Sequence, residues 1–535
     1  MIFNSLLSNM LILCNYPITH LSSILIRFWS FHPALFYGIS LLLGIYIHFF
    51  SFPSLLISFF FLLCPFIISV TQSNLFIKPL ILSSLVVFCG WFYTQSHYVL
   101  PIIPSEGVNG NAVIHILQLQ NKKSMFGERW VYSCEIHHWK SYDSSFSFSK
   151  KTPCLIFLSK DQEKKFGRPK ANQDYIITGK LIPLEKGGYQ LKLLSNSSWI
   201  PVNETSNFAE NRYQWKTVVS KWIKKKFPHQ KSGVFLAGLV TGEFDDYTIR
   251  QDFSRFGLQH LLAISGFHFA LIAAFLHFIL RIVFPMKYAL IILLTLLSGY
   301  CFFLGPQASI LRAWMMSALA IIGSLLQKKT TPLNLLGVAL MIVCVYNPYL
   351  SITLSFQLSF AIALAILLLY PLSNRLLEKI FNKRTLCDML KMTKLDQHGY
   401  CILGYLKNGM ALTIAVNSIA FPLTLYYFHQ FPFLSILYNL FFPFFVSWSL
   451  CLLIVGSLFS FLPFVSSFIH GINSFYTHFL LQMVSQIPEE MDVFINIDNI
   501  YPGWIILYLS ILVIGGVFLR EKMHVQHDEE SFSYI

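Results

Sequence analysis

The sequence predicts a polytopic α-helical membrane protein of about 10–12 spans, with a small extracytoplasmic β-barrel of the OB type inserted between them. Composition supports this class, because 55% of the 535 residues are apolar and 12% are charged, whereas soluble domains carry about 25% charge. A second observation is a set of apolar runs near the roughly 20 residues that cross the hydrocarbon core. A third is a polar interval whose short segments alternate in hydropathy. The apolar runs are 31–50, 55–70, 80–93, 257–280, 288–304, 309–326, 333–345, 352–370, 409–428, 434–461 and 504–519.

Composition and patterning divide the chain into five parts. Spans at the N-terminus precede the polar interval, and the apolar runs resume after a short basic segment. The parts are N-terminal spans (1–104), an extracytoplasmic OB-like β domain (105–205), a basic amphipathic interfacial helix (206–231), a transmembrane domain (232–461), and C-terminal helices with the last span and a short tail (462–535).

The polar interval predicts a small β-barrel. Five segments in it, among them "RWVYSCEIHHW" and "DYIITGKLI", alternate apolar and polar residues and are separated by clusters of Gly, Asn, Ser and Lys. Five short strands of this kind favour an OB-fold, which is a small five-stranded barrel. An unspecialised β-sandwich gives the same pattern, so the number of strands leaves both folds open.

Positive charge is concentrated in the β domain and in the segment that follows it. Residues 106–231 contain 21 Lys and Arg against 10 Asp and Glu, a net charge of +11 within a total of +14. In "NRYQWKTVVSKWIKKKF" aromatic and basic residues recur at helical spacing, with Trp215, Val218 and Trp222 on one face. This pattern predicts an interfacial helix that lies on anionic headgroups, and attraction of a polyanion is the alternative.

Two of the ten cysteines lie in the β domain, on neighbouring predicted strands. They are Cys134 and Cys154. If this domain faces an oxidising compartment, we expect the two to form a cross-strand disulfide.

Lysine and arginine in the short loops orient the spans. Arg281 and Lys287 flank one turn. Lys328 and Lys329 mark another turn, and the loop 372–408 carries seven more basic residues. Threading the spans alternately places all three loops on one side, which the positive-inside rule assigns to the cytoplasm. The β domain then lies outside the cytoplasm.

One apolar segment carries polar groups that a lipid-facing helix does not need. "LLAISGFHFALI" (261–272) contains Ser265, Gly266 and His268, and His260 precedes it. A Ser-Gly pair lets helices pack closely or lets a helix break, and imidazoles inside a membrane need polar surroundings. A packing notch and a break beside a polar path both remain open for this segment alone.

Polar or helix-breaking residues recur in several other spans. Together they indicate a bundle with a polar interior, which a simple membrane anchor does not require. These residues are Arg312, Ser355, Gln357, Ser359, Asn417, Pro422, Asn439 and Pro443.

The order of these motifs resembles the competence domain of the ComEC family. The resemblance covers residues 232–448 and rests on "GLVTGEFDDYTIRQDFSRFGLQHLLAISGFHFALI", "ILRAWMM", "SFQLSFAIALAIL" and "FPLTLYYFHQFPFLSILYNLFFPFF". It implies a channel in the bacterial inner membrane that passes single-stranded DNA into the cytoplasm during natural transformation. The family's signature positions fall on Gly257, His260, Ser265, Gly266, His268, Arg312, Gln357, Asn439 and Pro443.

The resemblance also implies the partners of the chain. Many members of the family end in a metallo-β-lactamase-like nuclease domain, but this sequence has no H-x-H-x-D-H motif and no G-x-x-x-x-G-K-[ST] loop. We therefore expect a transport protein with no catalytic residues, metal or cofactor. Its expected partners are single-stranded DNA, membrane lipids, a periplasmic DNA receptor, a separate nuclease and a cytoplasmic helicase-like motor.

The β domain is expected to bind single-stranded DNA weakly and with little sequence preference. Basic side chains would attract phosphates, and aromatic side chains would offer stacking surfaces. The candidates are Lys122, Lys123, Arg129, Trp130, Trp139 and Lys140.

Two other functions fit parts of the pattern. Ser265 and His268 would share a face of a continuous helix, as a nucleophile and its base do, but no third orienting residue can be assigned. A transporter of a small or lipid-linked anion would also use a polar bundle. The inverted repeat that is usual in such carriers is not found.

Overall fold

The computed structural model forms two compact units, each assembled from distant parts of the sequence. One contains Met1–Phe92, Ile322–Leu440 and Phe494–Ile535, and the other contains Tyr93–Ile321 and Phe441–Val493. The residues that the structure describes are 27–49, 77–124, 127–142, 147–170, 173–184, 188–194, 199–204, 208–244, 246–262, 264, 266–381, 384, 389, 391–487, 493–497 and 500–532.

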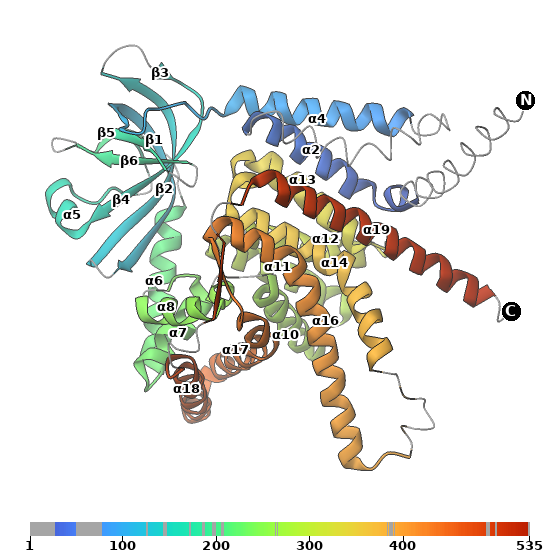
Figure 1. Cartoon of the computed structure of the whole chain (residues 1–535). Helices are drawn as coiled ribbons and strands as arrows, with labels where there is room; N and C mark the ends of the chain where they lie inside the picture. The colour runs from blue at the N-terminus through green and yellow to red at the C-terminus, as the bar shows by residue number, and fades with distance from the viewer. Residues whose placement is uncertain are drawn as a thin grey trace, which may run out of the picture. The chain divides into compact units, whose positions relative to one another are not determined.

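The polar interval folds into a closed β-barrel (Figure 1). Its strands pair in the ring β1-β2-β4-β6-β5, and β5 returns to β1. All of these pairs are antiparallel except β4–β6, and α5 connects β4 to β5. A five-stranded closed barrel with this order confirms the OB-like prediction over the sandwich. The elements are β1 (Val108–Ser124), β2 (Gly127–Ser141), β3 (Ser147–Phe148), β4 (Thr152–Ser159), α5 (Lys160–Phe166), β5 (Gln173–Pro183), β6 (Tyr189–Leu193) and β7 (Ile200–Glu204).

Alternation of the strands gives the barrel an apolar interior. Tyr132, Ile136 and Trp139 of β2 are fully buried, as is Ile114 of the neighbouring β1. Register shifts interrupt the β1–β2 pairing at Val113/Ile114 and again at Ile116/Gln118. Such irregularities bend a strand sharply, which a small barrel needs in order to close.

The second unit, which contains the barrel, also contains the helices that follow it in the chain. Helix α6 is the predicted basic amphipathic helix, and its Trp215, Val218 and Trp222 are exposed by 50%, 65% and 40%. The helices are α6 (Ala209–Lys226), α7 (Gln230–Thr241), α8 (Tyr247–Arg255), α9 (Gln259–Leu262), α10 (Gly266–Val283), α11 (Met286–Leu304), α12 (Ala308–Leu325), α17 (Ser435–Leu458), η3 (Phe459–Phe461) and α18 (Pro463–Ser485), of which α12 and α17 extend into the first unit.

The first unit is made of helices from both ends and the middle of the sequence. Helix α2 packs on α13, and α14 packs on both α16 and α19. The predicted apolar run 55–70 lies outside the described residues. The elements are α2 (Pro33–Phe49), α4 (Ile77–His97, which continues into the second unit), α13 (Pro332–Tyr346), η2 (Pro348–Ile352), α14 (Leu354–Ile380), α16 (Lys394–Phe428), β8 (Gln430–Pro432), β9 (Phe494–Asn496) and α19 (Pro502–Phe532).

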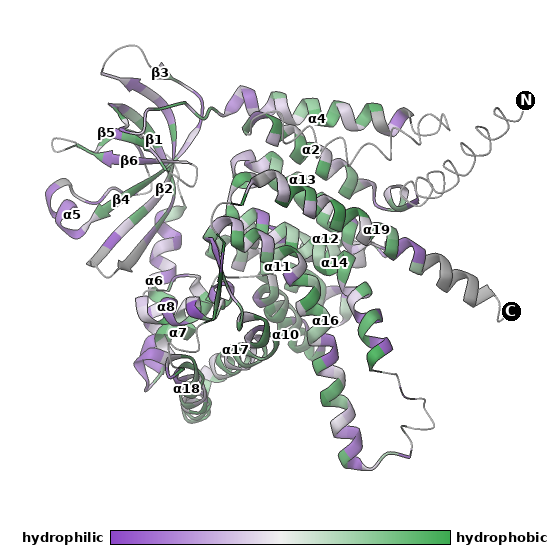
Figure 2. Cartoon of the chain, in the orientation of Figure 1, coloured by the Kyte–Doolittle hydropathy of each residue, from purple (hydrophilic) through white to green (hydrophobic). Residues whose placement is uncertain are grey.

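Helices long and apolar enough to cross a membrane dominate the described part of the chain. Seven of them meet this description, and α2 and α13 are shorter apolar helices. Figure 2 shows hydrophobic residues dominating the long helices and alternating with hydrophilic residues on the strands. The chain is therefore a polytopic helical membrane protein with an OB-like insert, as its sequence predicts. The membrane-length helices are α10, α11, α12, α14, α16, α17 with η3, and α19.

Candidate functional site

The signature segment is interrupted in the structure. Helix α9 ends at Leu262 and α10 begins at Gly266, with Ile264 between them in no regular structure. The predicted site residue Ser265 lies outside the described residues. A segment that is apolar enough to continue as one span is thus divided near its start. Backbone that is not helical avoids contact with lipid and is tolerated where protein or water surrounds it.

Gly257 ends the preceding helix. It has a φ of +64°, and the N–H of Leu258 donates to the carbonyl of Phe253 at 2.8 Å. Gly257 follows the C-cap residue Phe256 of α8 in the left-handed conformation, which side chains with a Cβ rarely adopt. His260 follows in α9, where its Nδ1 lies 3.1 Å from the Gly257 carbonyl and its side chain is exposed. These two signature residues therefore shape the approach to the interruption.

The interruption is anchored by the two helices that follow α10. Ile264 is 4% exposed and packs with Leu304 of α11 and Ile310 of α12. Ser309 Oγ donates to the Ile264 carbonyl at 3.2 Å, so an otherwise free backbone acceptor is satisfied from α12. The start of α10 is therefore held against the start of α12.

Arg312 of α12 lies against Gly266. A methyl group in place of the glycine hydrogen would overlap Arg312 Nη2, so glycine leaves the space that the guanidinium fills. The Arg312 Nε atom is buried, and it has no hydrogen-bond partner among the described residues. Gly266 and Arg312 are thus two signature residues that the fold brings together from separate helices.

His268 lies in the first turn of α10 and is 1% exposed. We predicted that it faces an aqueous path together with Gly266. In this structure protein covers its imidazole, because neighbouring side chains close the space around the first turn. Phe269, the next residue, stacks on Tyr300 of α11 with ring centroids 5.8 Å apart. The His268 imidazole is thus shielded from solvent, and its place beside a path stays a prediction.

The remaining signature positions lie on helices α14 and α17. Gln357 accepts a hydrogen bond from the Tyr427 hydroxyl and so joins α14 to α16. The Asn439 Oδ1 atom of α17 is buried and has no partner among the described residues. Pro443, one turn later, has no N–H to donate to the Asn439 carbonyl. Gln357 and Asn439 belong to the first unit, whereas Gly266 and Arg312 belong to the second.

Polar atoms without partners recur in the membrane-length helices. Burying such an atom costs free energy unless water or a ligand supplies the hydrogen bond. Unpartnered atoms are therefore places where a polar molecule could be accommodated. Within the described part of the chain they include His277 Nδ1 of α10, Arg312 Nε of α12, Ser359 Oγ of α14 and Asn439 Oδ1 of α17.

The barrel presents only part of the predicted DNA-binding set at its surface. Arg129 and Lys140 are exposed, and the Arg129 guanidinium lies over the ring of Phe157, 5.3 Å from its centroid. The prediction for Trp139 is wrong, because this side chain faces the barrel interior and is 0% exposed. No base can stack on it without opening the barrel. The side chains of Lys122 and Lys123 lie outside the described residues.

Trp130 has a structural partner on its face. The Arg168 guanidinium lies 4.5 Å from the Trp130 ring centroid and forms an ion pair with Glu210 of α6. The Trp130 indole N–H donates to Glu163 of α5 at 2.9 Å. Trp130 therefore joins the barrel to α5 and α6, and Arg168 occupies the face that a base would need. No periodic pattern in the sequence marks Arg168, because its partners are distant in the chain.

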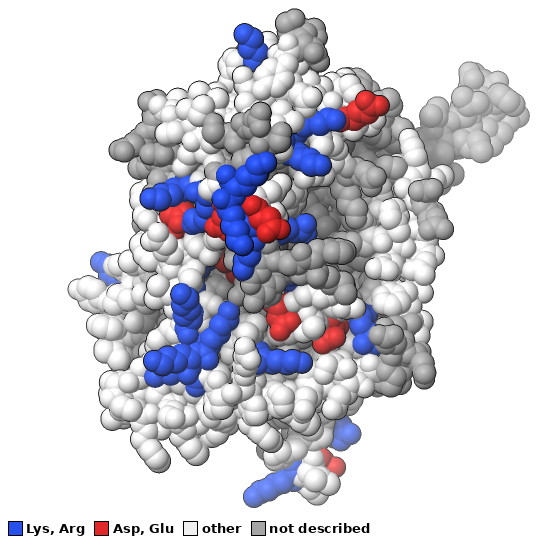
Figure 3. Space-filling view, turned by 90° about the vertical axis from the view of Figure 1, so that its left-hand side faces the viewer, with Lys and Arg blue, Asp and Glu red and all other residues white. Residues whose placement is uncertain are grey.

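A second arginine ties the barrel to the membrane helices. Arg212 of α6 donates through Nη2 to the Leu117 carbonyl of β1 at 3.1 Å. Its guanidinium also lies 5.9 Å from the Phe302 ring centroid near the end of α11. The same helix carries Lys216, whose pKa is lowered by burial although Glu243 lies 3.1 Å away and opposes that shift. Figure 3 views the side of the molecule that carries the barrel and α6, where Lys and Arg predominate.

Cys134 and Cys154 occupy directly opposite positions on β2 and β4. Both are buried free thiols in this structure, and burial raises the pKa of Cys134 well above its usual range. Their register meets the first geometric requirement for a bridge. The disulfide itself remains a prediction.

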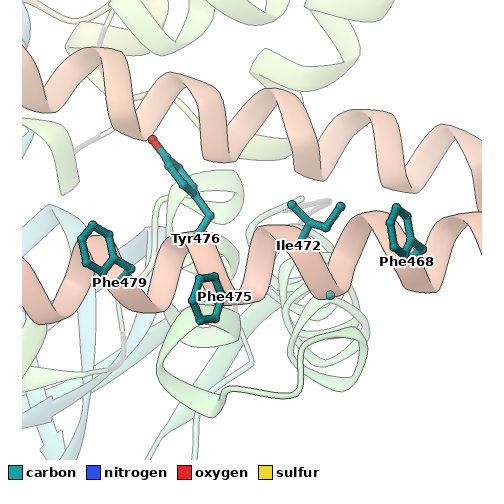
Figure 4. A pocket seen from close by; sticks show the side chains of 6 residues that line it. Phe468, Ile472, Phe475, Tyr476 and Phe479 are labelled. Carbon is teal, nitrogen blue, oxygen red and sulfur yellow. The ribbon is translucent and has the colours of Figure 1, made fainter.

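Helix α18 has its polar residues inside and its apolar residues outside. Asn473 Nδ2 donates to the Ser449 carbonyl of α17 at 3.0 Å, and Thr477 Oγ1 lies 3.0 Å from Ser449 Oγ. The Tyr476 hydroxyl donates to the Phe445 carbonyl at 3.2 Å, so its ring points toward α17 (Figure 4). A shallow apolar groove runs along α18. Its lining residues are Phe468, Gly471, Ile472, Phe475, Tyr476 and Phe479.

Comparison with known proteins adds three findings. The model of the Competence protein family matches residues 241–522. A curated relative, ComE operon protein 3 of Bacillus subtilis (strain 168), is 25% identical over 241 residues, which are 44% of this chain and 28% of the relative. The chain thus matches less than a third of that relative's length. No solved structure matches the chain.

Proposed function

Because this chain belongs to the competence protein family, we propose that it takes part in DNA uptake as a channel that passes single-stranded DNA through the inner membrane. The family match spans the membrane helices from the end of α7 into α19. It includes the boundary between α9 and α10 and Arg312 beside the start of α10. The proposal concerns the transport step alone.

The observation that carries the proposal is the set of unpartnered polar atoms inside membrane-length helices. Arg312, Ser359 and Asn439 contribute such atoms from α12, α14 and α17. A bundle that served only as an anchor would gain stability from apolar side chains at these places. In the proposed channel, water or a hydrated DNA strand supplies the missing hydrogen bonds within each unit. The interrupted helix adds non-helical backbone, which suits the wall of a path better than a lipid-facing surface.

The attachment of the barrel supports the same function. Arg212 connects β1 of the barrel to the end of α11, and α12 begins four residues after that end. The interruption before α10 is held against the start of α12. An OB-like barrel with a basic surface is therefore attached at the end of the helices where the interruption lies. We propose that this end faces out of the cytoplasm and that Arg129 and Lys140 attract DNA there.

In the proposed mechanism, other proteins carry out the steps before and after passage through the channel. We propose a periplasmic receptor that delivers DNA, a separate nuclease that leaves one strand, and a cytoplasmic helicase-like motor that pulls it. Each has a distinct failure phenotype, because loss of the receptor stops capture whereas loss of the channel stops a later step.

Deletion of the gene followed by a fluorescent-DNA uptake assay tests the proposal. We expect DNA to reach the periplasm as before and to stop arriving in the cytoplasm. Restoring the gene should restore arrival. Loss of periplasmic capture would instead identify an upstream receptor. Unchanged arrival of DNA in the cytoplasm would contradict the channel and favour transport of a smaller anion.

A further inference from the structure

Arg312 is an isolated charge within the membrane helices. It is the one charged residue between Lys287 and Lys328, and residues 253–377 contain no Asp or Glu. Its guanidinium has no hydrogen bond or ion pair with any described residue, and its Nε is shielded from solvent. A cation in a membrane span is costly unless it is paired with an anion or water. The surrounding helices supply no carboxylate for it.

The start of α10 supplies a second attraction for an anion at the same place. The first N–H groups of this 18-residue helix have no helical carbonyl to bond, and the helix dipole places partial positive charge there. Gly266 is the first residue of α10, and Arg312 Nη2 lies against it. Arg312, which has no partner among the described residues, therefore lies beside the first turn of α10. Helix starts of this kind bind phosphate, and a guanidinium offers phosphate two parallel donors.

We propose that Arg312 and the start of α10 form a binding site for one phosphodiester group of the DNA strand. This inference rests on the proposed channel function and assigns its site a ligand group. Arg312 donates through its guanidinium, and the N–H groups of Gly266 and Phe267 donate beside it. The glycine is needed because any side chain at 266 would displace the guanidinium. Because Arg312 has no fixed counter-ion, it can bind one phosphate briefly, release it and then bind the next phosphate of the strand.

The position of the site determines which step it serves. Arg281 and Lys287 flank the opposite end of α10 and α11, on the side that the positive-inside rule assigns to the cytoplasm. The Arg312 site lies at the other end of the same helices, where Arg212 attaches the barrel. A single DNA strand that leaves the surface of the barrel would thus meet this site as it enters the membrane. The site replaces the hydration that a phosphate loses there.

The first test measures phosphate binding by the full-length protein in maltoside micelles, which contain no lipid phosphate. Inorganic phosphate, compared with chloride at equal ionic strength, should raise the Tm of the wild-type protein, because a ligand of the folded state stabilises it. Arg312→Gln should lose that rise. Arg312→Lys should keep part of it, because the charge remains without the paired donors. Arg281→Gln is the matched control, since Arg281 is exposed and bonds to the Phe284 carbonyl.

The second test measures arrival of DNA in the cytoplasm of cells that carry the same variants at equal protein level. Arg312→Gln should reduce arrival by about tenfold or more, as expected for the loss of a charge-assisted contact. Arg281→Gln should leave it unchanged. A phosphate-dependent Tm rise that survives in Arg312→Gln would overturn the site, and so would normal DNA arrival in that variant.

The outcomes separate the site from the channel. If gene deletion stops arrival of DNA but Arg312→Gln behaves as wild type in both tests, the channel stands and the site fails. If deletion leaves arrival unchanged while phosphate stabilises wild type and Arg281→Gln alone, the site binds phosphate in another function. If phosphatidylglycerol added to the micelles abolishes the effect of phosphate and DNA arrival is normal in Arg312→Gln, the ligand is a lipid headgroup. Should Arg312→Gln fail to accumulate, absence of any phosphate effect on wild type rejects the site.

Discussion

The barrel and the α17–α18 pair place polar and apolar side chains in opposite ways. In the barrel, Tyr132 and Trp139 fill the interior while charged residues such as Lys140 face outward. In the helix pair, Asn473 and Thr477 are buried in a hydrogen-bonded seam, and α18 exposes a row of aromatic and aliphatic side chains. The exposed row is Phe464, Phe468, Ile472, Phe475, Phe479 and Met483.

The difference teaches that each region is matched to its surroundings. A barrel in water gains stability by hiding apolar area. We infer that the exposed face of α18 meets hydrocarbon, where a helix pair gains nothing from apolar contact and is joined by hydrogen bonds. Average hydropathy misses this arrangement, because the seam residues lower the mean of α18 below that of a membrane-length helix. Segregation of residue types around the helix, visible only with its neighbour in place, identifies the apolar face.

Removing Trp139 should have the largest effect. Trp139→Ala opens a cavity in the barrel core and should destabilise the barrel by about 3–5 kcal/mol. Trp139→Phe should cost much less, because the indole N–H has no partner among the described residues. Hydrogen exchange of the β1–β6 amides in the full-length protein measures both. If Trp139→Phe instead weakens DNA binding with normal exchange protection, Trp139 contacts DNA after all.

A charge on the exposed face of α18 should have the next largest effect. Phe475 is 70% exposed, and we expect Phe475→Lys to cost about 2.5–3.5 kcal/mol if this face meets hydrocarbon. The amount of membrane-inserted protein should fall accordingly. Ile102→Lys is the control, because Ile102 is 97% exposed beside the barrel, where a lysine meets water. If both variants are inserted equally well, α18 faces water, and the contrast drawn between the barrel and the α17–α18 pair is wrong.

Breaking the hydrogen-bonded seam between α17 and α18 should also lower stability, but by less. Asn473 bonds to the Ser449 carbonyl and accepts from Thr477 Oγ1 at 3.1 Å. Asn473→Ala leaves both partners buried without it and should lower stability by about 1–3 kcal/mol. Gln482→Ala, on the exposed side of the same helix, should be neutral. Thermal unfolding in micelles compares the two, and an equal Tm for both variants would mean that the seam contributes nothing.

Acid should weaken the barrel slightly through Glu135. Burial alone would raise the pKa of this carboxyl, but His137 and Lys151 outweigh burial and lower it, with Lys151 at 3.5 Å. A lowered pKa stabilises the fold above the ordinary Glu value of about 4.3, and that stability is lost as pH falls through the folded value. Glu135→Gln should therefore make the stability of the barrel less dependent on pH below about pH 4.3. Identical acid curves for variant and wild type would show that the ion pair has no effect.

Sequence alone determined the features that depend on local pattern. Alternation predicted five strands, and all five form, because a strand with one buried face must repeat every two residues. Apolar runs predicted the spans, because length and composition suffice to cross a bilayer. The Ser-Gly pair and its neighbours marked the place where α9 and α10 separate, because glycine weakens a helix, but the sequence left a packing notch and a break both open there.

Tertiary structure decided which of these residues meet and which are hidden. Trp139 and Lys140 are neighbours in sequence, and both are predicted to bind DNA. In β2, however, Trp139 faces inward and Lys140 faces outward. Arg312 and Gly266 lie 46 positions apart, and only the packing of α12 against the start of α10 brings the guanidinium to that first turn. Their meeting depends on contacts between distant segments, which no local pattern encodes. Whether a polar side chain inside the membrane finds a partner is likewise a property of its neighbours in space.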